Sequence, residues 1–124
     1  MEESNKKYQE KEIVERTFKF GVRAVNLANS LPKTPAGFAI GNQIVKSGTS
    51  IGANLAEAQF AQSKKEFIKI VYTALKESRE TKFWLLIIIK SDIISHNRLN
   101  SLLKECEEII CILATIVKKS RINS

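Results

Sequence analysis

The chain has 124 residues, of which 44% are hydrophobic and 27% are charged, and it contains two prolines and five glycines. This length fits one domain, residues 1–124, and leaves no room for a second, while the composition is typical of an ordinary soluble, all-helical protein. The formal net charge of +7 favours a polyanionic partner such as RNA, DNA or an anionic membrane face, although a basic surface also keeps a protein soluble.

The sequence shows no sign of export or of membrane insertion. Its N-terminus is polar and lacks the apolar run of a signal peptide. The longest apolar run, from Phe83 to Ile89, is far shorter than the roughly 20 residues that a membrane span needs. Cys106 and Cys111 point about 140° apart on one predicted helix, so we expect two reduced core thiols. We therefore predict a cytoplasmic protein with no membrane partner.

The first predicted helix covers residues 10–31, and we expect the charged residues 1–9 to be frayed. Two adjacent stripes form a wide apolar arc on this helix: Ile13, Thr17, Gly21, Ala24, Ala28 and Leu31, and beside them Val14, Phe18, Val22 and Val25. An arc of this width predicts a helix that is wedged between two others. Pro32 ends the helix, because proline cannot continue the hydrogen-bond ladder.

The second predicted helix covers residues 35–61, with Thr34 as its cap and Pro35 at its first position. A line of glycines runs beside a line of large aliphatic residues: Gly41, Gly48 and Gly52, and Ile40, Ile44, Ile51 and Leu55. A glycine inside a helix is less favourable than alanine by about 0.5 to 1 kcal/mol. Three on one line therefore predict a neighbouring helix that lies too close for a β-carbon.

The third predicted helix covers residues 63–91 and begins with Ser63 and Glu66, the spacing of a capping box. The fourth covers residues 95–119, with Ser95 as its cap. Both helices carry apolar residues at helical spacing along one side. Four helices of similar length joined by short loops predict an all-α, antiparallel up-down-up-down four-helix bundle.

The sequence carries more apolar surface than one bundle interior can hold. Residues 83–89 and 109–114 are apolar around the whole helix circumference, so a lone bundle would leave half of each run in water. We therefore predict self-association through an interface on the third and fourth helices. The alternative is a monomer with an unusually apolar surface.

No set of catalytic or metal-ligating residues stands out. His96 is the one histidine, which excludes a metal site built on paired imidazoles and argues against Cys–His nucleophilic chemistry. The segment Gly48–Gly52 lacks the Gly-Lys-Ser/Thr of a phosphate loop. Acidic side chains such as Glu77 and Glu80 are expected to be neutralised in surface ion pairs. We predict no catalytic residue, no metal site, no cofactor and no enzymatic activity.

Several polar residues fall on or near the core-facing sides of the second and third helices. We expect hydrogen bonds across the bundle, to partners such as Glu57 or Arg79, that fix the register of these two helices. The alternative is ligand binding. The residues are Ser47, Asn54, Ser78 and Thr81.

The outer side of the third helix gives the clearest indication of function. Tyr72 and Phe83 lie among basic residues there, a pattern suited to phosphates and unstacked bases. The alternative is a solvated face whose aromatic rings pack on a neighbouring subunit. These basic residues fall within about 40° of one line along the whole helix: Lys65, Lys69, Lys76, Arg79 and Lys90. A second cluster ends the fourth helix, where cations also suit the helix dipole: Lys118, Lys119 and Arg121.

Three segments together resemble a known family: Ser-Ile-Gly-Ala-Asn-Leu-Ala-Glu at Ser50 to Glu57, Ser-Lys-Lys-Glu-Phe-Ile from Ser63, and Ala-Leu-Lys-Glu-Ser-Arg-Glu-Thr-Lys-Phe-Trp-Leu at Ala74 to Leu85. They are similar to the bacterial four-helix-bundle family of 23S rRNA intervening-sequence proteins, over nearly the whole domain. Ala58 stands where such proteins usually have glycine. We assign to the structural motif Gly48, Ile51, Gly52, Asn54, Glu57 and Glu80.

The resemblance implies a bundle assembled into a ring, a homopentamer with a central channel, and no catalytic residue. Members encoded within rRNA insertions imply association with RNA, and a related branch acts as accessory protein to the reverse transcriptase of diversity-generating retroelements. We therefore predict a non-catalytic homo-oligomer that binds nucleic acid, RNA above all. The alternative is a protein-interaction scaffold, such as a reverse-transcriptase partner. The predicted nucleic-acid-binding residues are Lys65, Lys69, Tyr72, Lys76, Arg79, Lys118, Lys119 and Arg121.

Overall fold

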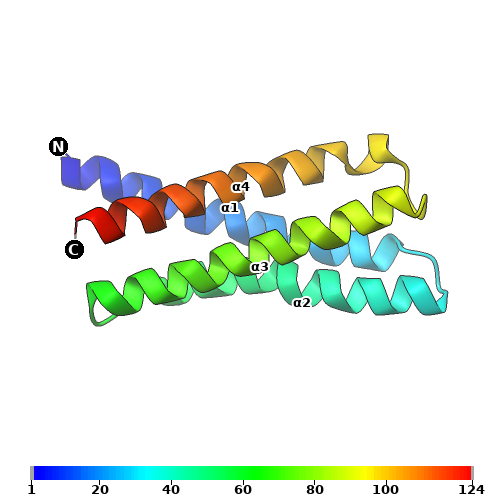
Figure 1. The fold of residues 1–124 in the computed structure, drawn as a ribbon, viewed down its shortest axis with the longest axis horizontal. Helices are drawn as coiled ribbons and strands as arrows, with labels where there is room; N and C mark the ends of the chain where they lie inside the picture. The colour runs from blue at the N-terminus through cyan, green and yellow to red at the C-terminus, as the bar shows by residue number, and fades with distance from the viewer. Residues whose placement is uncertain (1, 124) are drawn as a thin grey trace.

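The structure is a computed structural model that describes residues 2–123, with side chains from residue 11 onward. The described residues form four α-helices and no strand: α1 (Glu2–Ser30), α2 (Pro35–Ala58), α3 (Lys64–Lys90) and α4 (His96–Ile122). Each helix packs against the next, and α1 also packs against α4, so the chain is an all-α four-helix bundle with its two ends at the same end of the molecule (Figure 1). Over the described residues, none of these helices has an apolar stretch that could cross a bilayer.

The start of α1 differs from the sequence prediction. The helix begins at Glu2 instead of near residue 10, so the expectation of a frayed segment is wrong for residues 2–9, and residue 1 lies outside the described residues. No proline or glycine precedes Gly21, so the local sequence offers nothing that would interrupt the helix. The other helices begin and end within three residues of the predicted positions.

Short polar side chains begin α2 and α3 as predicted. Thr34 caps α2 and Ser63 caps α3, each by accepting a hydrogen bond from the backbone amide three residues further on. The Glu66 carboxylate accepts from the Gln62 amide, at 2.8 Å, so this half of the predicted capping box falls one residue earlier than Ser63. Ser95 is the N-cap of α4 but forms no side-chain cap hydrogen bond.

The core between the helices is aliphatic and contains a polar link between α2 and α3. Thr81 Oγ1 donates a hydrogen bond to Ser47 Oγ at 2.9 Å, and both side chains are buried. This contact confirms a predicted hydrogen bond between α2 and α3, but the partners are Ser47 and Thr81 themselves and not Glu57 or Arg79. The fully buried aliphatic side chains of the core include Ile44, Ile51, Val71, Leu85, Ile88, Ile109 and Leu113.

The other two residues predicted to bridge the bundle bond within their own helices. Ser78 Oγ donates to the Leu75 carbonyl at 2.7 Å, and Asn54 Nδ2 donates to the Ser50 carbonyl at 2.8 Å. The prediction is wrong for these side chains, because a carbonyl three or four residues back is the nearest acceptor for a short polar group on a helix. The Ser78 backbone carbonyl does join two helices, since it accepts from the Cys106 thiol of α4 at 3.3 Å.

The helices α1 and α2 approach each other closely at two glycines. A β-carbon on Gly48 would lie 2.6 Å from the Ala24 β-carbon, and one on Gly52 would lie 3.0 Å from the Thr17 carbonyl oxygen. The predicted close approach is confirmed at these positions. It is wrong at Gly41, where the nearest atoms would be at an ordinary 3.7 Å.

Exposed large apolar side chains lie on α1, on and directly after α2, on α3 and at the end of α4. The first helix packs between α2 and α4 as predicted, but its second apolar stripe is exposed at Phe18, Val22 and Val25. On α3 the exposed large hydrophobic residues are Tyr72, Phe83 and Leu86. Residues 109–114 of α4 are buried or half-buried except for Cys111, whose thiol is therefore exposed and not in the core as predicted.

Candidate nucleic-acid interface

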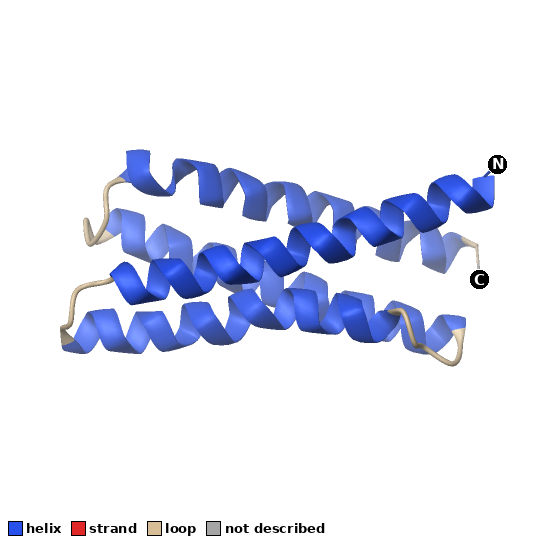
Figure 2. Cartoon of the chain, turned by 180° about the vertical axis from the view of Figure 1, so that it is seen from behind, coloured by secondary structure: helices blue, strands red, loops and turns tan. Residues whose placement is uncertain are grey.

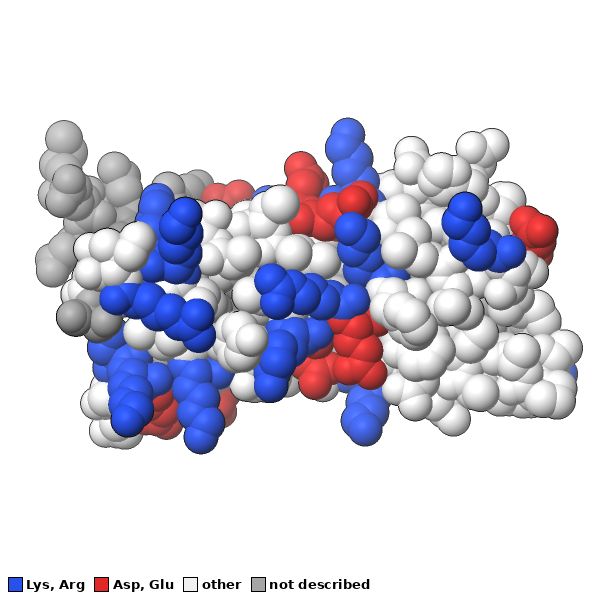
Figure 3. Space-filling model, in the orientation of Figure 1, with Lys and Arg blue, Asp and Glu red and all other residues white. Residues whose placement is uncertain are grey.

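The basic residues predicted on the third helix lie on the outward side of α3 and are all exposed: Lys65, Lys69, Lys76 and Arg79. Figure 3 shows Lys and Arg side chains gathered over the half of the molecule where α3 begins and α4 ends, while the opposite half of this face is largely uncharged. Beyond Arg79 the outward positions of α3 pass to Phe83 and Leu86, which are exposed. The basic stripe is therefore concentrated in the first half of α3, with Lys90 apart at its end.

Tyr72 joins the two basic clusters that the sequence shows as separate. Lys76 Nζ lies 5.5 Å from the centroid of the Tyr72 ring, and the guanidinium carbon of Arg121 lies 5.2 Å from it. Both distances are within the range of a cation–π interaction. Tyr72 thus holds a cation of α3 and a cation of α4, and a base could stack on it only where these cations leave the ring free.

A second contact fixes the end of α4 against the start of α3. Lys64 Nζ donates to the backbone carbonyl of Asn123 at 2.5 Å. Lys64 is absent from the predicted set, although its position directly before Lys65 is a signal that the sequence offered. Together the exposed cations of both helices form what we call the basic surface: Lys64, Lys65, Lys69, Lys76, Arg79, Lys118, Lys119 and Arg121.

The α3 cations of this surface are not neutralised by carboxylates. Among the side chains of residues 11–123, ion pairs are formed by Arg16, Lys19 and Lys82. Like charges held side by side without counter-charges create a positive potential that attracts polyanions. No such pair within the described part of the chain is formed by Lys64, Lys65, Lys69, Lys76 or Arg79.

The carboxylates nearest the basic surface form no ion pair with it. Burial raises the pKa of Glu77 and the nearby Glu80 raises it further, while Lys46 and Lys76 lower it. Glu57 and Glu80 are exposed. None of these three carboxylates forms an ion pair with a described side chain, so the predicted neutralising pairs with α3 cations are wrong.

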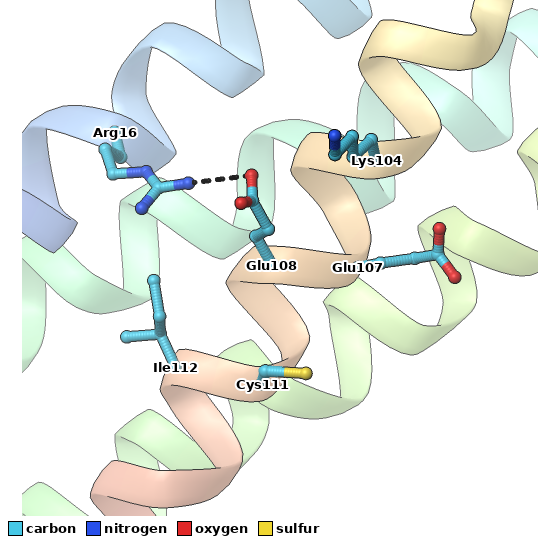
Figure 4. A pocket seen from close by; sticks show the side chains of 6 residues that line it. All are labelled: Arg16, Lys104, Glu107, Glu108, Cys111 and Ile112. Atoms are coloured by element: carbon cyan, nitrogen blue, oxygen red, sulfur yellow. Dashed lines mark hydrogen bonds and ion pairs between the residues drawn. The ribbon is translucent and has the colours of Figure 1, made fainter.

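A shallow depression between α1 and α4 has a volume of about 480 Å³ and is lined by Arg16, Lys104, Glu107, Glu108, Cys111 and Ile112 (Figure 4). Arg16 reaches across it to Glu108 at 3.4 Å and also pairs with Glu105, whose hydrogen bond raises the pKa of Arg16. His96 is the first residue of α4, about four turns from Cys111. Within the lining Arg16 pairs with Glu108, while Glu107 pairs with Lys82 of α3. Among the described side chains, no three potential ligands are grouped as a metal ion requires.

Residues 9–115 match the sequence profile of a family described as 23S rRNA-intervening sequence protein. The chain belongs to this family. The match includes all of α2 and α3 and ends before Lys118. The α4 cations of the basic surface therefore lie beyond the matched span of this 23S rRNA-intervening sequence family member.

Among solved structures, the chain is similar to a protein with unknown function from the S23 ribosomal protein family of Bacteroides thetaiotaomicron VPI-5482, whose crystal structure extends to 1.70 Å resolution. The two share 39% sequence identity with a TM-score of 0.81, and the likeness covers 86% of this chain and 98% of that chain. No curated protein matches the chain. These comparisons establish the family and the fold of this 23S rRNA-intervening sequence family member and assign it no activity.

Proposed function

We propose that this protein is a non-catalytic, cytoplasmic nucleic-acid-binding protein whose principal ligand is RNA. The observation that carries the proposal is the basic surface, where α3 cations without carboxylate partners among the described side chains meet the end of α4 at Tyr72. Lysine and arginine that neutralise phosphates release counterions, which gives affinity with little dependence on base sequence. Membership of a family named for sequences that intervene in 23S rRNA supports RNA as the ligand.

The proposal includes assembly into a homo-oligomer, a ring of five subunits as the family resemblance implies, built from up-down-up-down bundles. The connecting loops at alternating ends of the bundle support this topology (Figures 1 and 2). The exposed apolar side chains support assembly, because a partner subunit would remove them from water. In a ring the basic surface recurs once per subunit, so weak contacts to one RNA act together.

The first test is the salt dependence of RNA binding, measured by fluorescence anisotropy with labelled single-stranded and duplex RNA. If four to six phosphates are neutralised, Kd rises by about 100- to 1,000-fold between 50 and 200 mM salt. Binding that stays constant over this range would contradict a phosphate-based interface.

The second test locates the site with matched charge reversals. The double variant Lys69→Glu/Lys76→Glu should weaken RNA binding by at least about 10-fold, because two phosphate contacts become repulsive. The control Lys33→Glu/Arg98→Glu changes the net charge equally, at exposed positions outside the basic surface, and should have a much smaller effect. Equal losses would show that only overall charge matters and would reject the basic surface as the site.

A protein partner on α3, such as a reverse transcriptase, is the second candidate. Phe83 is 54% exposed and lies next to the basic half of the helix. Its ring contacts the Trp84 ring edge-on, with centroids 5.1 Å apart, and Trp84 Nε1 is buried without a hydrogen-bond partner among the described atoms. Exposed aromatic residues of this kind are typical anchors of protein interfaces. A Lys69→Glu/Lys76→Glu variant that keeps RNA affinity but loses a co-purified protein would select this function.

A further inference from the structure

The aromatic ring at the centre of the basic surface is engaged by cations of the chain itself. Tyr72 is 37% exposed, and its ring centroid lies 5.5 Å from Lys76 Nζ and 5.2 Å from the guanidinium carbon of Arg121. A cation over an aromatic ring occupies ring surface on which a base would stack. A base could therefore use this ring only in competition with two cations from two different helices.

The basic surface lacks a series of aromatic residues on the helices that form it. These two helices, α3 and α4, contain four Phe, Tyr or Trp residues, and all four are on α3. Phe67 is half-buried and packs against the core, while Phe83 and Trp84 lie beyond Arg79, about 17 Å from Tyr72 along the helix. Proteins that bind single strands stack successive bases on several aromatic side chains, and α3 and α4 provide no such platform among their cations.

The contact with Tyr72 leaves both cations able to bind phosphate. A lysine ammonium has three N–H donors and an arginine guanidinium has five, and a ring attracts the charge through its π-face without removing it. Long side chains lose rotamer freedom when they bind a ligand, and a contact that restrains them beforehand reduces this loss. Tyr72 thus fixes Lys76 and Arg121 in place for a phosphate.

The cations form two adjacent rows, one on α3 and one at the end of α4. On α3, Lys65 and Arg79 are separated by about 21 Å at 1.5 Å per residue, and the bond from Lys64 to the Asn123 carbonyl holds the end of α4 beside this row. Figure 3 shows Lys and Arg side chains gathered over this half of the molecule. A DNA duplex presents about one phosphate charge per 1.7 Å of its axis, from two strands, and a single strand about one per 3.4 Å. Two rows of restrained cations suit the denser and more rigid array of a duplex.

Carboxylates flank one side of the α3 row. At 100° per residue, Glu66 and Glu77 lie about 100° and 120° around the helix from Lys65, and Glu80 lies about 60° from it in the same direction. None of the three forms an ion pair with a described side chain. Their negative charge repels a polyanion from that side, which confines it to the line of α3.

We propose that the basic surface binds duplex RNA through the phosphates of both strands, with Tyr72 as a positioning residue that holds Lys76 and Arg121 and not as a platform for a base. This inference rests on the proposed function, whose ligand it narrows from RNA to duplex RNA. A-form RNA presents phosphates and 2′-hydroxyl groups along a wide, shallow minor groove, and proteins recognise it mostly by its shape. Cations at fixed spacings meet this requirement, and no base has to leave the stack.

The first measurement compares two RNA probes on the wild-type chain by fluorescence anisotropy. One is a duplex of about 16 base pairs, the length that a double-stranded RNA-binding domain spans, and the other is an unpaired strand with the same number of phosphates. The duplex should bind at least about 10-fold more tightly, because both rows of cations meet phosphates. Equal affinities, or tighter binding of the strand, would overturn the duplex preference and leave RNA binding standing. If neither probe binds in a salt-dependent way, the proposed function fails as well.

A double-mutant cycle tests the role of Tyr72. Tyr72→Leu should weaken duplex binding by about 2- to 5-fold, the factor that corresponds to one exposed cation–π contact, while Tyr72→Phe should keep the wild-type affinity because it keeps the ring. In the Lys76→Gln/Arg121→Gln chain the ring has neither of these cations to hold, so Tyr72→Leu should have no further effect. Phe83→Leu is the matched control, since it removes an exposed ring of α3 outside the basic surface, and it should leave duplex binding unchanged.

A Tyr72 ring that stacks on a base would give different results. Tyr72→Leu would then weaken binding of the unpaired strand more than binding of the duplex, and it would do so in the Lys76→Gln/Arg121→Gln chain as well. Either result, or wild-type duplex affinity of the Tyr72→Leu chain, would overturn the positioning role. Circular dichroism checks the helix content of each variant, and if Tyr72→Leu loses helix content, Tyr72→Gln replaces it in the cycle.

Discussion

Gly48 and Gly41 lie on the same side of α2 and differ in what surrounds them. At Gly48 an added β-carbon would meet the Ala24 β-carbon at 2.6 Å, whereas at Gly41 the nearest atoms would be 3.7 Å away. An added β-carbon at Gly48 could be accommodated only if the two helix backbones moved apart, because Ala24 has no flexible side chain that can move aside. Two identical residues in one helix should therefore respond in opposite directions to the same substitution.

Gly48→Ala should lower the free energy of unfolding by about 1 to 3 kcal/mol, the usual effect of overpacking a core. Gly41→Ala should raise it by up to about 1 kcal/mol, since alanine is the better helix former and has room there. Urea unfolding followed by circular dichroism measures both values. A Gly48→Ala chain as stable as the Gly41→Ala chain would show that α1 and α2 do not approach as described.

The two thiols should differ in reactivity. Burial raises the pKa of Cys106 to about 12, while Cys111 is exposed, and only the thiolate reacts with iodoacetamide. At pH 8 the folded chain should therefore take up one label, on Cys111, and a second only after denaturation. Mass spectrometry of the intact and the digested chain identifies the site. Fast labelling of Cys106 in the folded chain would contradict its burial.

The same pKa shift predicts a loss of stability at high pH. Cys106 titrates near 9.0 when unperturbed and near 12 in the folded chain, so the unfolded chain releases this proton first as the pH rises. The contribution to stability is therefore complete below pH 9 and is lost between pH 9 and 12. The decline in free energy of unfolding over this interval should be steeper for the wild type than for Cys106→Ala. Parallel curves for the two chains would rule out the linkage.

At the scale of helices, the bond between Thr81 and Ser47 ties α3 to α2 inside an aliphatic core. Each side chain also has a local acceptor, since Ser47 Oγ reaches the Gln43 carbonyl and Thr81 Oγ1 reaches the Glu77 carbonyl. Removing one partner therefore does not leave the other without a hydrogen bond. The value of the link lies in its geometry, because it fits only one register of the two helices.

A double-mutant cycle with Ser47→Ala and Thr81→Val measures this link. Because both residues are buried and in contact, we expect a coupling energy of about 0.5 to 1.5 kcal/mol. The control cycle pairs Ser47→Ala with Ser78→Ala, whose hydroxyl bonds within α3, and should show no coupling beyond error. Additive effects in the first cycle would mean that the hydrogen bond does not contribute to register. Urea unfolding supplies all the free energies.

At the scale of the whole molecule, the bundle presents two different surfaces on different sides. The cations gather where α3 begins and α4 ends (Figure 3), whereas Phe18, Val22 and Val25 of α1 and Phe38 of α2 are exposed apolar residues. In the proposed homo-oligomer the basic surface would recur once per chain.

A long RNA should bind the wild-type chain on the order of 100-fold more tightly than an RNA short enough to contact one subunit, because linked sites in the proposed oligomer provide a high effective concentration. The variant Lys69→Glu/Lys76→Glu should weaken the binding of both RNAs, which is the control that each length uses the basic surface. Fluorescence anisotropy with the two lengths gives the comparison. Equal affinity of the wild-type chain for short and long RNA would contradict the role of multivalency.

The family resemblance could be recognised from the sequence, and so could the four helices. Caps such as Thr34 and Ser63 act on amides three residues away, and helical spacing alone placed Lys65, Lys69, Lys76 and Arg79 on one exposed side. These features depend on neighbours along the chain, so local chemistry determines them. The basic stripe could be assigned to α3 for the same reason, because it depends only on the spacing of residues within one helix.

Only the tertiary structure could show which side of each helix is covered by another helix. The position of Arg121 over the Tyr72 ring, the contact that requires glycine at position 48 but not at 41, and the exposure of Phe18 all depend on another helix. Helical periodicity tells which residues share a side, but it does not tell which side a distant segment will cover. That depends on how the four helices pack, because a contact between two helices is set by the shapes of both.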